Sequence, residues 1–128
     1  MSWVLSAWLV ASPETLAVQD AVSVEAGATC LEPTRVVDEL VAWLGSGQMD
    51  AGLRLRVVGD PEEPRKARFE LFRAGTKIVE REFVEGPSNC DDFHTVVGLA
   101  AAIAIDDRVA ASLGLTGEAT EAKPEPAA

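Results

Sequence analysis

Two cysteines, Cys30 and Cys90, constrain this chain more than any other feature, because a predicted helix follows each of them. They are the only cysteines among the 128 residues. Two isolated cysteines in an exported protein usually form a disulfide, and this one would join two helix starts. A thiol at a helix N-terminus can also be reactive, because the helix dipole favours its thiolate. We expect a structural disulfide, and a redox-active pair or two free thiols are the alternatives.

The two helices have recognisable starts and ends. Pro33 suits a first helical position, and apolar residues then recur at helical spacing until Gly45 ends the helix. Ser88 or Asn89 can cap the second helix, which is rich in alanine and ends near Asp106. Both helices therefore begin within three residues of a cysteine.

Between the helices, apolar and polar residues alternate as they do in half-buried strands. One strand covers residues 53–58, and a hairpin over residues 67–84 turns at Gly75. Phe72 and Ile78 fall on the opposite parity. Either a β-bulge shifts the register of the hairpin, or its second face is partly covered.

A weaker alternation over residues 19–28 predicts a strand that ends at Gly27, and residues 46–51 read as a polar turn. The predicted order is strand, helix, three strands, helix. We therefore expect an α+β domain of two layers, in which a mostly antiparallel sheet of three to four strands carries both helices on one face. This single domain covers residues 19–113.

Residues 1–17 form an apolar segment whose first twelve residues carry no charged side chain. The run is too short to span a bilayer, and it suits the hydrophobic region of a signal peptide cleaved near Ala11 or Ala17. The basic region that normally precedes it is missing, since Arg35 is the first basic residue. We expect an export signal; a buried N-terminal helix or strand that carries Trp3 and Trp8 is the alternative.

The net charge of −10 argues against nucleic acid and anionic membrane surfaces as general partners. Residues 114–128 are acidic and rich in Pro and Ala, so we expect a disordered tail. Residues 54–81, in contrast, hold eight basic and five acidic residues, a net charge of +3. This segment is either a basic face that binds an acidic partner or a set of solvated faces with cross-strand ion pairs. The candidate partner-binding residues are Arg54, Arg56, Arg68, Arg73 and Arg81.

Catalytic motifs are absent from the sequence, which has no G-x-S-x-G, P-loop, G-x-G-x-x-G or H-E-x-x-H. Glu80 and Glu82 share one side of a strand, where alternating glutamates are usually just exposed. Cys30, Cys90 and His94 have the residue types of a zinc site, but their spacing matches no common zinc pattern, and a disulfide would consume both thiolates. We expect no enzyme activity, cofactor or metal, and a surface or partly buried His94.

Several features combine in the part of the chain from Cys30 to Asp106. A proline-started helix follows Cys30, Arg81 lies on the return strand of the hairpin, and Asn89-Cys90 opens a helix of small apolar residues. This part resembles a small domain found in exported bacterial cell-envelope proteins. The resemblance implies an envelope location and pairing of the two cysteines, and it brings no assigned activity.

These observations favour a non-enzymatic domain of the periplasm or cell envelope that acts by protein–protein contact. The contact surface would be an exposed sheet edge or the arginine-rich strand face. One alternative is a cytosolic acidic adaptor or chaperone-like dimer that binds protein segments at a sheet edge. A second alternative is a thiol or metal site at Cys30, Cys90 and His94.

Overall fold

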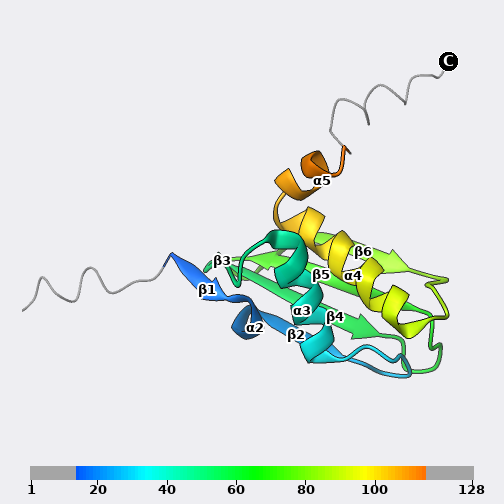
Figure 1. The fold of residues 1–128 in the computed structure, drawn as a ribbon. Coiled ribbons are helices and arrows are strands. Elements are labelled where there is room, and N and C mark those ends of the chain that lie inside the picture. Colours follow the sequence, from blue (N-terminus) through cyan, green and yellow to red (C-terminus); the bar gives the residue numbers. More distant parts are fainter. Residues whose placement is uncertain (1–13, 115–128) are drawn as a thin grey trace, which may run out of the picture.

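Two helices, α3 (Pro33–Leu44) and α4 (Cys90–Ile105), lie side by side on one face of a four-stranded sheet (Figure 1). The structure is a computed structural model that describes residues 14–114. The strands stand in the order β2 (Val22–Glu25), β4 (Leu53–Gly59), β5 (Ala67–Arg73) and β6 (Thr76–Phe83). Neighbouring strands from β4 to β6 are antiparallel. The predicted α+β, two-layer architecture is confirmed.

The strand β2 runs parallel to β4, because α3 connects them as a crossover and returns the chain to the same end of the sheet. Val22 and Val24 are half-buried on one side of β2, and Ser23 and Glu25 are exposed on the other, as the alternation predicts. The strand itself is shorter than the expected 19–28. A single helical turn, α2 (Val18–Ala21), precedes it and buries Val18 and Ala21, which are three positions apart and so share one side of the turn.

A second, two-stranded sheet pairs β1 (Thr15–Ala17) with β3 (Gln48–Asp50) in antiparallel fashion. The prediction of a polar turn over residues 46–51 was therefore wrong at β3. The central residue of that strand, Met49, is buried, and the partner strand lies in the segment that was expected to be part of an export signal.

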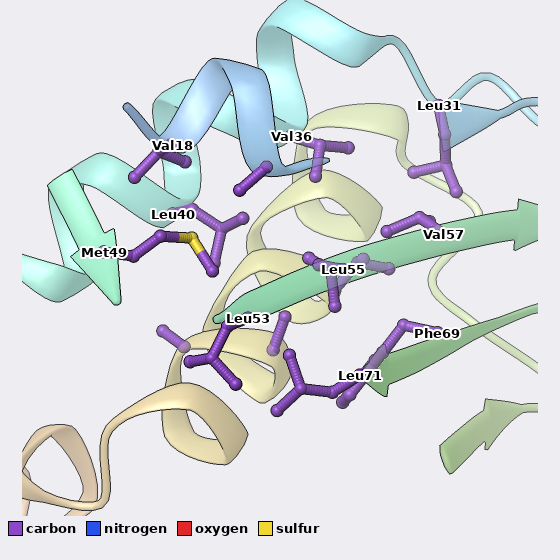
Figure 2. Close-up of a cluster of buried hydrophobic side chains, with 14 of the residues drawn as sticks. Val18, Leu31, Val36, Leu40, Met49, Leu53, Leu55, Val57, Phe69 and Leu71 are labelled. Carbon is purple, nitrogen blue, oxygen red and sulfur yellow. The ribbon is translucent and has the colours of Figure 1, made fainter. Parts of the chain in front are cut away.

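The core fills the space between the sheet and the two helices (Figure 2). Alternate residues of the two central strands point into it, while α3 contributes residues four positions apart, as one helix face requires. The labelled side chains of Figure 2 from these three elements are Val36, Leu40, Leu53, Leu55, Val57, Phe69 and Leu71. Fully burying each such side chain stabilises the fold by about 1.5–3 kcal/mol.

The helices α3 and α4 run parallel, with both N-termini at the same end of the sheet. Arg35 in the first turn of α3 forms an ion pair of 2.6 Å with Asp91 in the first turn of α4. Further along the two helices, Gly98 of α4 faces Glu39 of α3 so closely that a Cβ atom at residue 98 would overlap the Glu39 side chain. The glycine therefore sets how near the two helices can lie.

The β5–β6 hairpin contains the β-bulge that the parity change at Ile78 indicated. Leu71 pairs with Val79, but the next residue, Phe72, pairs with Lys77, so Ile78 has no partner in the ladder. Its side chain is 49% exposed. At Ile78 the parity change therefore reflects a β-bulge, and the side chain is not covered by another part of residues 14–114.

The chain beyond α4 adds a short helix, α5 (Arg108–Ser112). The expected signal segment lies outside the described residues as far as residue 13, and so does the expected tail from residue 115 onwards. Among residues 14–114, no helix combines the length and the apolar character needed to cross a membrane.

Candidate functional site

The predicted disulfide joins Cys30, in the loop before α3, to Cys90, the first residue of α4. The two Cα atoms are 6.1 Å apart, within the usual range for a disulfide. Asn89 caps α4, because its Oδ1 accepts a hydrogen bond of 3.0 Å from the main-chain N–H of Asp92. Of the two caps that the sequence offered, Asn89 is the one used.

His94 lies one turn after Cys90 and is fully buried, so the expectation of a surface or partly buried histidine was wrong. Its Nε2 accepts a hydrogen bond of 2.9 Å from the main-chain N–H of Glu32, just before α3. Its Nδ1 lies 2.9 Å from the main-chain oxygen of Cys90, to which it donates when Nε2 is the acceptor. The imidazole therefore ties the start of α3 to the start of α4, in parallel with the disulfide.

Cys30, Cys90 and His94 are brought together as a metal site would require, with their ligand atoms within 4.8 Å of one another. The structure nevertheless uses each of these atoms for something else. The two sulfurs are bonded to each other, and both ring nitrogens of His94 are hydrogen-bonded to the main chain. Metal binding would require reduction of the disulfide and loss of at least one of these hydrogen bonds.

A surface hollow of about 470 Å³ opens beside the disulfide. It is lined by both cysteines, by Arg65 and Phe93, and by the two prolines Pro64 and Pro87. Cys30 itself is exposed and Cys90 is half-buried. Solvent and small molecules can therefore reach this end of the domain at the disulfide.

The face of the sheet opposite the helices carries charged side chains around a central carboxylate, Glu70 of β5. Three cations from neighbouring positions surround it: Arg56 at 3.3 Å, Arg68 at 3.3 Å and Lys77 at 3.6 Å. Burial raises the pKa of the Glu70 carboxyl, but the hydrogen bond from Arg68 and the three positive charges outweigh burial and hold that pKa below its ordinary value. The sequence reasoning missed this residue. The available signal was that Glu70 is the only acidic residue of β5 and has basic residues on both neighbouring strands.

The five arginines proposed as a partner-binding set do not form one surface. Arg54, Arg56 and Arg68 lie on the open face of the sheet, whereas the strand parity of Arg73 and Arg81 places them on the helix side. Arg56 also pairs with Glu25, and Arg73 pairs with Asp50. Of these five arginines, only Arg54 and Arg81 have no ion-pair partner within residues 14–114. On the face of the sheet opposite the helices, Arg56 and Lys77 form ion pairs with acidic residues of neighbouring strands. Such cross-strand ion pairs were the alternative to a basic face that binds an acidic partner.

The edge strand β6 has no strand partner on its outer side within residues 14–114 (Figure 1). It is eight residues long, and most of its side chains are exposed. Glu80 and Glu82 lie on the open face, as their shared parity predicted, and Lys77 binds Glu80 at 2.7 Å. Helix α4 packs over β5, so Val79 and Phe83 on the helix side of β6 are only half-buried.

Comparisons with protein-family models, with curated proteins and with solved structures found no match to this chain. The function is therefore argued from the geometry of the disulfide and of the sheet edge.

Proposed function

We propose that this chain is an exported, disulfide-containing domain of the periplasm or cell envelope that works by binding another protein at the edge strand β6. It performs no catalysis in this proposal. The observation that carries it is the outer edge of β6, which pairs with no other strand among residues 14–114 and whose main chain can accept one further strand.

The side chains of β6 favour pairing with a partner over pairing with a second copy. Its residues 77–82 include Lys77, Glu80, Arg81 and Glu82, and charged residues on an edge strand oppose uncontrolled strand addition. Two apolar side chains, Ile78 at the bulge and Val84 just after the strand, are 49% and 63% exposed. Burial of these two side chains by a bound segment would add to the main-chain hydrogen bonds.

The disulfide supports the proposed location in the periplasm or cell envelope. Disulfides persist in oxidising environments such as the periplasm and are rare in the reducing cytosol, and in this one Cys30 is exposed and Cys90 half-buried, so the core does not protect it from reductants. Of the two cleavage positions expected for an export signal, the one near Ala11 keeps β1 intact, whereas cleavage after Ala17 would remove β1 and leave β3 unpaired. We therefore propose cleavage near Ala11.

Two measurements on the protein from its native host test the proposal. Intact mass and alkylation with and without reductant should show two blocked cysteines and a chain that begins near residue 12. A photo-crosslinking amino acid at residue 78 should give one discrete adduct in vivo, whereas the same amino acid at the exposed residue Asp38 of α3 should give none.

Free thiols on a chain that begins at Met1 or Ser2 would refute the export half and favour the cytosolic adaptor. Equal crosslinking at residues 78 and 38 would refute β6 as the binding edge. A crosslinked dimer of this chain would identify the chaperone-like dimer instead.

A further inference from the structure

We propose that the Cys30–Cys90 disulfide is a reversible thiol–disulfide exchange site, at which a low-molecular-weight thiol attacks the sulfur of Cys30 and Cys90 leaves. This inference does not depend on partner binding at β6. Three observations carry it: the unequal exposure of the two cysteine residues, the position of Cys90 in α4, and the second set of contacts that holds the same two helix starts together.

Access favours attack at Cys30. Cys30 is exposed in the loop before α3, whereas Cys90 is half-buried at the start of α4. The hollow beside the disulfide, about 470 Å³ in volume, has room for a small thiol such as glutathione to approach. Exchange rates depend on which sulfur can be reached, so Cys30, the more exposed of the two residues, supplies the electrophilic sulfur in this proposal.

The surroundings of Cys90 favour its departure as a thiolate. It is the first residue of a 16-residue helix, where main-chain N–H groups and the positive end of the dipole stabilise negative charge. The imidazole Nδ1 of His94, which donates to the main-chain oxygen of Cys90, also lies 3.6 Å from the Cys90 sulfur. Of the two acidic residues in the same turn, Asp91 is neutralised by Arg35, and Asp92 is exposed. Cys30 lies in the loop two residues before Glu32, the N-cap of α3, so it is farther from its helix start than Cys90 and a thiolate leaving from it would be stabilised less.

The exchange balances with a thiol as the only co-reactant. The thiolate forms a bond to the Cys30 sulfur, the bond between the two cysteines breaks, and its electron pair leaves on Cys90. A second thiol can then attack the mixed disulfide and release Cys30 as a thiolate. The net result is a two-electron reduction of the protein disulfide and oxidation of two thiols to one disulfide.

The domain is built to keep its shape while the disulfide is open. The hydrogen bond from the Glu32 N–H to His94 and the ion pair of Arg35 with Asp91 still join the start of α3 to the start of α4. Cys30 and Cys90 therefore stay close after reduction, and the reverse reaction can reform the bond.

The test treats the oxidised full chain briefly with glutathione, traps free thiols with N-ethylmaleimide and maps both groups by peptide mass spectrometry. Glutathione should be found on Cys30 and maleimide on Cys90, in about tenfold excess over the reverse arrangement. The reverse arrangement, equal amounts of both products, or reaction only after addition of denaturant would each overturn the proposal.

A matched pair of variants tests the role of the helix start. Asp92→Asn removes a negative charge from the first turn of α4 and should speed the exchange about twofold. Asp107→Asn removes an exposed charge beyond the other end of α4 and should leave the rate unchanged. An Asp92→Asn variant that reacts at the wild-type rate would contradict the assignment of Cys90 as the leaving group.

Discussion

Replacing both cysteines by serine measures how much the covalent link between the two helix starts stabilises the fold. The sequence separation of 60 residues sets the size of the effect, because a disulfide mainly limits the freedom of the unfolded chain. For a loop of this length the chain-entropy model gives about 4 kcal/mol at 25 °C. A domain of about 100 residues should then lose roughly 15–30 °C in melting temperature.

Urea unfolding followed by circular dichroism checks this value for the Cys30→Ser/Cys90→Ser variant against the oxidised wild type. We expect the variant to remain folded at 25 °C, because the Glu32–His94 hydrogen bond and the Arg35–Asp91 ion pair persist. Its dependence on urea should be slightly steeper, because an uncrosslinked unfolded chain exposes more surface.

The reduced wild type is the control, since it has the same open loop without any substitution. Its free energy of unfolding should lie within about 1 kcal/mol of that of the double variant. A loss below about 1 kcal/mol in both proteins would refute the reasoning, because the loop would then already be constrained in the unfolded state.

Three further predictions concern single side chains. His94→Leu leaves the Glu32 N–H, which donates to the fully buried imidazole, without its acceptor, so the free energy of unfolding should fall by about 1–3 kcal/mol and exchange of that amide hydrogen, followed by NMR, should accelerate. The pKa of Glu70 is lower in the folded than in the unfolded state. The stabilisation that Glu70 contributes is therefore present above its unfolded pKa of about 4.3 and is lost as the pH falls through its folded pKa. The variant Glu70→Gln lacks this contribution, so its stability should depend less steeply on pH in acid unfolding. Gly98→Ala should cost about 1–3 kcal/mol in thermal unfolding by pushing α3 from α4, whereas Gly47→Ala, which meets open space, should change stability by less than about 0.5 kcal/mol.

The main elements were predictable because their signals are local. Alternation of apolar residues indicates β4 and β5, and helical spacing after Pro33 indicates α3, whatever lies elsewhere in the chain. The pairing of β1 with β3 was not predictable in this way. Each strand has only three residues, and its partner lies more than 30 positions away, so neither segment shows a period of its own. The parallel pairing of β2 with β4 was not predictable from local signals either, because it depends on the end of the sheet to which α3 returns the chain.

The same distinction holds for the candidate site. The disulfide was predictable because the chain has only two cysteines, each at a helix start. The burial of His94 was not, because its partners are a main-chain N–H and a main-chain oxygen, groups that every non-proline residue carries. The arginines were correctly placed on strands, but which of them share a face depends on the register of the hairpin and its bulge.

The disulfide also determines whether proteolytic cleavage separates the chain into two fragments. The loop between β4 and β5 is exposed from Pro61 to Arg65, so a trypsin-like enzyme can cleave after Arg65 once the hydrogen bond from the Gly86 N–H to the Arg65 carbonyl oxygen opens. Because this bond lies inside the covalent ring from Cys30 to Cys90, cleavage there leaves two polypeptides that remain attached to each other and paired in one sheet. A cut molecule of this kind would run as two fragments only after reduction, and it would keep its β6 edge in place.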